Sequence, residues 1–399
     1  MIPLKSATRW LSIANGFCQM LFILPVVVLF YEYKGLSIGD FFLIQGLHRL
    51  FIFVIEVPTG YIGDIFSRKQ TVLMGFFIHA LGYLCWIFGY GFWFILAGEL
   101  LFAMALGLIS GTLEAYLYDL LKKRHKEEKY HLKLAKMETI GNASLMFATL
   151  TGAFVYQFFG PVAPVWAGVV CVLICVGICA LLPDVPESKR IVAAEKSKMQ
   201  DILDISKFAM KHPEIKWLMI FPGVYGTLTL VFWWGLQPVM IEQNVPIFMF
   251  SFVVGLGAFM RTFWSALSGK ALDKFKLSGV IKILWGIIIV ASVAAVAAVY
   301  VPAGSVYICL FLMIMGTGSI VLAKVATSVL VNHRIQSDER ATVLSVKNMV
   351  DKAATGLGMV CLKPLFDGIG MGPTFMVSSL VLLPIILWSA CHLYKMHLK

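Results

Sequence analysis

Long apolar runs recur along the whole sequence, and each is long enough to cross a lipid bilayer as one helix. A helix needs about 20 apolar residues to cross a hydrocarbon core of about 30 Å. Hydrophobic residues make up 59% of the chain and charged residues 14%, which excludes an ordinary soluble domain. The first run is long and contains Asn15, Gln19 and Pro25, so it is not expected to be a cleaved signal peptide. The sequence predicts an all-α membrane protein with twelve spans, at residues 8–31, 40–62, 70–90, 92–117, 138–159, 162–182, 214–236, 247–269, 279–301, 305–329, 343–366 and 372–394.

Basic residues gather in alternate connections between the predicted spans. If the N-terminus is cytoplasmic, Arg68, Lys69 and the run Lys122-Lys123-Arg124 fall on the cytoplasmic side, and little beyond Lys34 falls outside. The positive-inside rule then places both termini in the cytoplasm of a multi-pass protein of the cell inner membrane. The same distribution explains the formal net charge of +11 without a nucleic-acid partner.

A charged stretch bounded by prolines divides the chain near its middle. Dense charge between Pro183 and Pro213 is typical of a linker. Apolar residues between 193 and 210 are spaced as in an amphipathic surface helix. The sequence thus predicts an N-terminal six-helix bundle at 1–183, a cytoplasmic linker with an amphipathic helix at 184–213, and a C-terminal six-helix bundle at 214–399.

One short loop occurs twice. Gly60 is followed four residues later by Asp64 and then by Arg68-Lys69, and Gly269 is followed at the same spacing by Asp273 and further lysines. A repeated loop in so apolar a chain indicates two homologous halves, an organisation found in many secondary transporters.

Enzymatic and metal-dependent functions find no support in the motifs. The chain has no nucleophile motif, Walker sequence or metal-binding histidine pair. Cys171, Cys175 and Cys179 lie on one helix face, where free cysteines serve as small apolar packing residues. We therefore expect no enzyme, no cofactor and no metal.

The string Gly60-x-x-x-Asp64-x-x-x-Arg68-Lys69 resembles the signature loop between the second and third helices of the major facilitator superfamily. Ser67 stands where that family usually has glycine. The strings 56–60, 110–115 and 340–345 resemble a poorly characterised bacterial subgroup that has Glu-Val-Pro-Thr-Gly in its second helix. The resemblance implies two pseudo-symmetric six-helix bundles that rock around a central site. Two hallmarks of the superfamily are missing: the usual membrane-embedded arginine of the fourth helix, and the Gly-Pro pair of the fifth helix that is typical of drug–proton antiporters.

Polar residues inside the spans are the candidates for the transport site, because a charge at mid-membrane costs roughly 2.5–3.5 kcal/mol on insertion scales. In the second span, Gln45, His48, Arg49 and Glu56 share one helix face. In the eleventh span, Asp351 is expected to pair with Lys347 or Lys352, and the Lys347 pair is interpreted as structural. Lys363 is expected to extend to the interface. The predicted substrate-binding residues are Arg49, Gln45, Asn15, Gln19, Arg261, Lys324, Asp351 and Lys352.

Three residues are predicted to carry coupling protons: Glu56, Glu99 and His48. Each has an alternative role. Glu56 could belong to a cytoplasmic latch, His48 could be a hydrogen-bonded packing residue, and Glu99 could meet water at the outer interface.

A cytoplasmic gate is predicted around the repeated loop. Salt bridges from Glu114 and Asp119 to loop arginines would form when the cavity opens outward and break when it opens inward. The predicted gate residues are Gly60, Asp64, Arg68, Glu114, Asp119, Asp273 and Arg340.

The cavity residues lean toward positive charge, which attracts anions in a low-dielectric cleft. We expect proton-coupled export of a small anionic or amphipathic compound by a monomer. The alternatives are a proton-coupled uptake symporter or facilitator for a small organic anion, and a non-transporting sensor with the same fold. Trp233 and Trp234 are expected in the interfacial aromatic belt.

Overall fold

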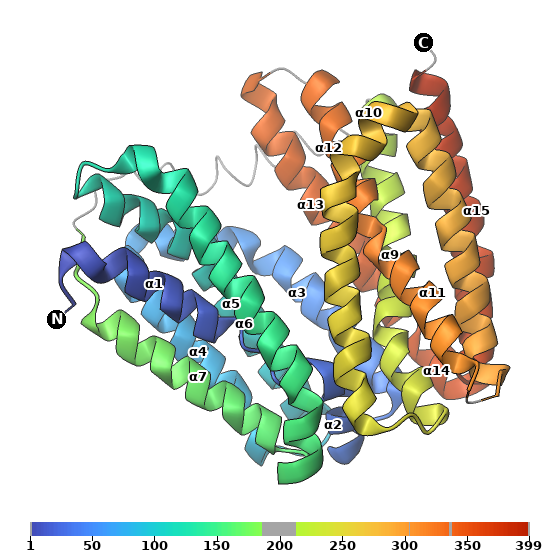
Figure 1. Ribbon diagram of the computed structural model, residues 1–399, viewed down its shortest axis with the longest axis horizontal. Helices are drawn as coiled ribbons and strands as arrows, with labels where there is room; N and C mark the ends of the chain where they lie inside the picture. The colour runs from blue at the N-terminus through green and yellow to red at the C-terminus, as the bar shows by residue number, and fades with distance from the viewer. Residues whose placement is uncertain (1, 186–212, 303, 335–336, 398–399) are drawn as a thin grey trace. The chain divides into compact units, whose positions relative to one another are not determined.

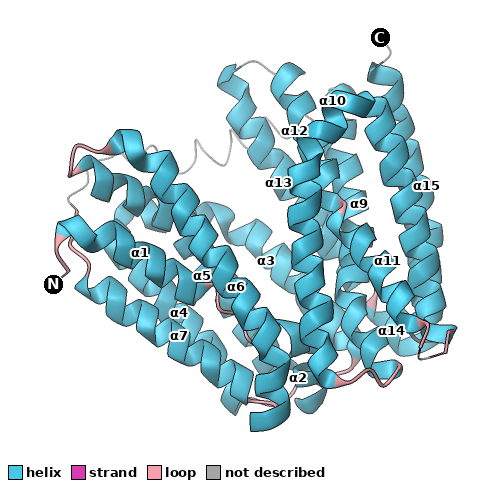
Figure 2. Cartoon of the chain, viewed as in Figure 1, coloured by secondary structure: helices cyan, strands magenta, loops and turns pink. Residues whose placement is uncertain are grey.

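The computed structural model describes residues 2–185, 213–302, 304–334 and 337–397, and all regular secondary structure within these ranges is helical (Figure 2). Some helical positions are described by their backbone alone: 57, 60, 61, 63, 64, 213–215, 332–334, 337–342, 344–345 and 395–397. The amphipathic helix expected at 193–210 lies outside the described residues.

The chain forms two compact units, each built from more than one stretch of sequence. Unit 1 comprises 1–36, 51–195 and 247–251, and unit 2 comprises 37–50, 196–246 and 252–399. The helix α3 (Ile38–Ile65) therefore contributes its first half to unit 2 and its second half to unit 1. The predicted division at 1–183, 184–213 and 214–399 remains a prediction.

Unit 1 contains a first span that is broken rather than continuous. The segment predicted at 8–31 consists of α1 (Leu4–Cys18), the 3-10 helix η1 (Leu24–Val26) and α2 (Val27–Tyr33). Pro25 stands at the start of η1, where its missing N–H group is tolerated. Gly152 lies against the carbonyl of Phe22 in this break, so a glycine lets a neighbouring helix approach.

The remaining helices of unit 1 are long and largely uninterrupted. They are α4 (Arg68–Phe88), α5 (Phe92–Lys122), α6 (Tyr130–Phe159) and α7 (Ala163–Leu181) (Figure 1), and a short 3-10 helix, η2 (Glu127–Lys129), precedes α6. The α4 helix packs against both α5 and α7, and α1 packs against α6 and α7. Small residues at such crossings let membrane helices come close together.

Besides the first half of α3, unit 2 contains α9 (Pro213–Glu242), all but the first five residues of α10 (Ile247–Tyr300), α11 (Val306–Gly318), α12 (Ile320–Arg334), α13 (Ser337–Val360), α14 (Lys363–Ile369) and α15 (Met371–His397). The α9 helix lies inside this unit, packed against α11, α12, α13 and α15. The α10 stretch holds two predicted spans, and the chain turns between them at Lys276, whose φ is 53° (Figure 1).

Eight described segments are apolar and long enough to cross a membrane by themselves. The α10 segment contains two of the predicted spans, and α11 with α12 forms one. The other spans are α1 with α2, α6, and α13 with α14, which are shorter, broken or more polar. The prediction of an all-α fold with twelve spans is confirmed.

Candidate functional site

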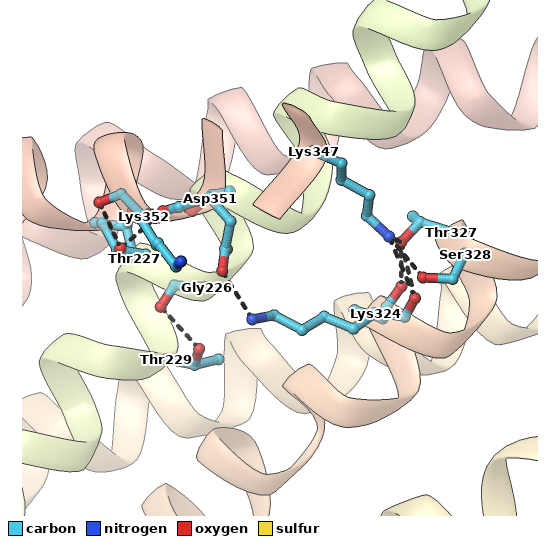
Figure 3. A network of polar contacts seen from close by, with 12 residues as sticks. Gly226, Thr227, Thr229, Lys324, Thr327, Ser328, Lys347, Asp351 and Lys352 are labelled. Carbon is cyan, nitrogen blue, oxygen red and sulfur yellow. Dashed lines mark hydrogen bonds and ion pairs between the residues drawn. The ribbon is translucent and has the colours of Figure 1, made fainter. Parts of the chain in front are cut away.

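An ion pair joins α12 to α13 in unit 2. The Lys324 Nζ atom lies 2.8 Å from the Asp351 Oδ2 atom (Figure 3). The expectation that Asp351 pairs with a lysine of its own helix is wrong in this structure, since the ion pair crosses to the neighbouring helix. Lys347, the candidate four residues before Asp351 on the same helix, instead donates to hydroxyls of α12.

Lys347 is hydrogen-bonded to neutral groups. Its side chain is 5% exposed, and its ammonium donates to the hydroxyls of Thr327 (2.9 Å) and Ser328 (2.8 Å) (Figure 3). These hydroxyls solvate the charge without cancelling it. The interpretation of Lys347 as half of a neutralising pair is therefore wrong here, and the site retains its positive charge.

The Asp351 carboxylate lies against a glycine of α9. A Cβ atom on Gly226 would come within 3.1 Å of Asp351 Oδ1. That buried oxygen has no hydrogen-bond partner among the described side chains. Within the described part of the chain, this carboxylate thus accepts its charge-assisted hydrogen bond from Lys324, through Oδ2.

Two arginines extend the same group of charges. Arg49, in the unit 2 half of α3, is close enough to Asp351 and to Arg261 for their charges to interact. Gly46 and Gly356 allow this approach, because a Cβ on Gly46 would lie 2.8 Å from the Gly356 carbonyl on α13. We call Arg49, Arg261, Lys324, Lys347 and Lys352, with Asp351, the basic cluster.

One member of the basic cluster, Arg261, packs against an aromatic ring. The Arg261 guanidinium lies 4.4 Å from the centre of the Trp233 ring, a cation–π contact. Trp233 is buried, and Trp234 packs edge-on against Phe41 with ring centres 5.3 Å apart. The expectation of an interfacial belt is wrong for these two residues, because α9 is surrounded by other helices of its unit.

The other predicted substrate residues are placed as follows. Gln45 is buried and His48 is half-buried on the unit 2 part of α3, and each makes an interaction there. Asn15 is buried in unit 1, where its amide donates to the Met137 carbonyl of α6 at 3.1 Å. Gln19 lies near Gly141 of the same helix. The structure thus places Asn15 and Gln19 at the contact between α1 and α6.

Glu99 is a buried carboxylate of unit 1. Its side chain is 6% exposed, and Oε1 accepts a 2.6 Å hydrogen bond from the Tyr31 hydroxyl. Tyr31 in turn packs edge-on against Trp86. The alternative in which Glu99 meets water at the interface is therefore wrong. Glu56 is half-buried in the unit 1 part of α3 and makes an interaction of its own.

The predicted gate is only partly described. Arg68 Nε lies 3.8 Å from Asp119 Oδ2, between the start of α4 and the end of α5. Glu114 is exposed on α5, and burial together with the Glu114 charge raises the pKa of Tyr130. Asp273 is exposed on α10. The side chains of Asp64 and Arg340 and the surroundings of Gly60 lie outside the described residues.

Ser67 and Lys69 have structural roles that the loop pattern did not reveal. The Ser67 hydroxyl accepts from the Gln70 N–H at 3.3 Å, and the Gln70 side chain accepts from the Ser67 N–H at 3.2 Å. This capping box begins α4. Lys69 donates to the Leu182 carbonyl at 2.7 Å and pairs with Asp184, so it holds the end of α7 against α4.

A second ionic group of unit 2 was also missed. Lys363 of α14 pairs with Asp40 of α3 and with Asp367, and Ser37 donates to Asp367 at 2.8 Å. Lys363 therefore joins α3 to α14, and its extension to the membrane interface stays a prediction. The spacing of four residues between Lys363 and Asp367 was the available signal.

Comparisons with known proteins agree with this architecture. Residues 10–359 match the family model described as Major Facilitator Superfamily. An uncharacterised transporter of Buchnera aphidicola subsp. Acyrthosiphon pisum is 22% identical over 241 residues, which are 60% of this chain and 54% of that protein. The chain thus spans about half the length of this curated relative.

Solved structures of transporters share the fold. The nucleoside transporter NupG has a TM-score of 0.81 at 13% identity, covering 99% of both chains. A bacterial homologue of the human lysosomal transporter Spinster, solved inward-facing and unoccupied, has a TM-score of 0.73 at 13% identity, covering 99% of this chain and 97% of that one.

Proposed function

Because the chain belongs to the major facilitator superfamily, whose members are secondary transporters of small solutes, we propose that it moves a small organic anion across the cell inner membrane with proton coupling. The mechanism is alternating access, in which two bundles expose a central site to each side in turn. The proposal keeps both termini in the cytoplasm and the protein as a monomer.

The observation that carries the proposal is the basic cluster. The cluster holds five cationic side chains and one described carboxylate, and one of the cations, Lys347, is buried and donates to two hydroxyls and a backbone carbonyl. Such charge is costly inside a membrane protein and is usually retained for a substrate or ion. An anion is the solute that this surplus of positive charge attracts. The Trp233 ring beneath Arg261 suits an anion that also has an apolar part.

Proton coupling is proposed from the buried acids. Glu99 combines burial with a hydrogen bond from Tyr31, and a carboxyl group in such surroundings can exchange a proton as its environment changes. Glu56 and His48 remain further candidates. The Arg68–Asp119 pair is proposed as part of the cytoplasmic gate that opens and closes during the cycle.

Transport by purified protein in liposomes tests the proposal. The liposomes contain a pH dye and are challenged with organic anions, amino acids, sugars and cationic drugs. We expect an anion to move protons in the wild type and not in Arg49→Ala or Glu99→Gln, with Lys274→Gln, an exposed position on α10, as the control. Proton movement with cationic drugs alone would contradict the anion assignment.

The same assay separates the alternatives. Export and uptake differ in the gradient that drives the flux, and a facilitator moves the anion without protons. Binding of an anion with no flux in any gradient would support a sensor with a transporter fold. Export is the direction that the sequence predicts.

A further inference from the structure

We infer that the Lys324–Asp351 pair makes anion binding and protonation cooperative, so that an anionic solute and a proton occupy unit 2 together. The inference rests on the proposed function and specifies the coupling within it. It assigns coupling to Asp351, which the sequence placed among the substrate-binding residues, in addition to the buried Glu99.

The two partners of the pair differ in exposure. The Lys324 side chain is 49% exposed and the Asp351 side chain 14%. A solute can therefore reach the ammonium, while the carboxylate stays covered beside Gly226. An anion that binds Lys324 competes directly with Asp351 Oδ2 for the same N–H groups.

Loss of the hydrogen bond from Lys324 shifts the Asp351 carboxylate toward its protonated form. Asp351 Oδ1 has no hydrogen bond to a described side chain, so the Lys324 bond is the one that a bound anion would take away. The anion also places a like charge close to the carboxylate, which favours its protonated form. Both effects act in the same direction.

The other groups facing Asp351 act in the opposite direction but not selectively. Arg49 from α3 and Lys347 and Lys352 from α13 favour a charged carboxylate, whereas α9 presents the uncharged Gly226 and Thr227 (Figure 3). These cations are present with and without the anion, so they do not remove the coupling.

The step balances in protons and charge. The Lys324 ammonium keeps its protons and moves one hydrogen bond from Asp351 Oδ2 to an anionic oxygen of the solute. Asp351 gains one proton from water. One negative charge and one positive charge enter together, so the net charge of the basic cluster is unchanged, and the loaded protein carries no extra charge through the hydrocarbon.

A direction for transport follows from this cooperativity. Exchange of a proton for an anion requires that binding of one excludes the other, whereas here each favours the other. The pair therefore favours movement of anion and proton in the same direction, the uptake symport alternative, over export by exchange.

Proton uptake on anion binding tests the inference. Methanesulfonate is added to purified protein in weakly buffered detergent solution with a pH indicator, and its binding is followed by calorimetry. The sulfonate stays ionised, so any proton taken up binds to the protein. We expect uptake by the wild type and by the Lys274→Gln control. By linkage, binding should be about 5- to 150-fold tighter in acid than in alkaline solution.

Variants of the two residues test proton uptake and anion binding separately. Asp351→Asn should bind the sulfonate with a reduced pH dependence and without the proton uptake of the wild type. Lys324→Gln should lose binding, and Lys324→Arg should restore it. The elution volume on size exclusion checks that each variant is folded, and Lys324→Arg keeps the test decisive if Asp351→Asn does not fold.

Three outcomes would overturn the inference: no sulfonate binding by the wild type, binding without proton uptake, or undiminished uptake by Asp351→Asn. The proposed function would survive each of them if the liposome panel still showed proton-coupled anion transport, and the coupling would then belong to Glu99, Glu56 or His48. Failure of the panel with a positive sulfonate result would instead indicate a sensor.

Discussion

At the scale of single residues, the basic cluster depends on small neighbours that leave room for charged side chains. Gly226 faces Asp351 Oδ1, and Gly46 and Gly356 bring the backbones of α3 and α13 together. The buried Lys347 ammonium is solvated by Thr327 and Ser328 rather than by an acid. These neutral residues determine where the ionic ones can lie.

Replacing Gly226 by alanine tests this role. The new methyl group would lie 3.1 Å from Asp351 Oδ1, so the carboxylate would have to shift by a few tenths of an ångström, and we expect its bond to Lys324 to weaken. Overpacking of this kind costs about 1–3 kcal/mol. We expect lower thermal stability in detergent and a lower rate of transport in the liposome assay.

Gly286→Ala is the matched control for Gly226→Ala, because a Cβ atom at position 286 meets nothing within 4 Å. It lies in the same unit and also in the interior of a long helix. Equal behaviour of the two variants would show that crowding of Asp351 is not the cause of any defect.

At the scale of elements, the start of α4 shows how one residue can replace another in the signature loop. Ser67 occupies the position where the family usually has glycine, and it caps α4 through reciprocal bonds with Gln70. Serine and glycine are both accepted at the beginning of a helix, for different physical reasons. The next residues, Arg68 and Lys69, then point their charges toward α5 and the end of α7.

Ser67→Ala and Ser67→Gly make a matched pair. Replacing the capping serine by alanine should lower the free energy of unfolding by about 1 kcal/mol, whereas glycine should lower it by only a few tenths of a kcal/mol. Thermal unfolding in detergent, followed by circular dichroism, measures the difference. Equal stability of serine and alanine would mean that the cap contributes nothing measurable to α4.

At the scale of the whole molecule, the proposed alternating access requires that a gate on the cytoplasmic side opens and closes. The Arg68–Asp119 pair has a separation of 3.8 Å, longer than a close ion pair, and its side chains are partly covered. A contact of this kind between two helix ends can be made and broken at a modest cost in free energy.

Neutralising Asp119 tests the gate without altering the basic cluster. Asp119→Asn should fold normally and bind methanesulfonate like the wild type, but transport in liposomes should fall at least tenfold because the gate no longer closes. Tyr118→Phe is the control, since Tyr118 is exposed at the same helix end. Full transport by Asp119→Asn would remove this residue from the gate.

Most of the fold follows from patterns that are local in sequence. Apolar runs of membrane length predict the helices, because a span must satisfy its own backbone hydrogen bonds in lipid. The number of these runs and the repeated loop predict the family. The breaks at Pro25 and between α13 and α14 were not predicted, since they depend on what packs beside them. For the same reason, a solved transporter shares this fold at a sequence identity of only 13%.

The composition of the site was likewise visible before its geometry. Arg49, Arg261, Lys324, Asp351 and Lys352 stand out as charges within apolar runs. Their partners do not, because contacts between helices join residues that are far apart in the chain. The pairing of Asp351 with Lys324, the hydroxyls around Lys347 and the Tyr31–Glu99 bond all cross from one helix to another.

The sequence by itself thus determined that this is a helical membrane protein of the major facilitator superfamily with a surplus of positive charge in its spans. Only the tertiary structure decided which charges meet. Hydrophobic length and charge placement act along the chain and are legible in it, whereas an ion pair depends on which helix faces pack together, and many arrangements of the same helices satisfy the same pattern.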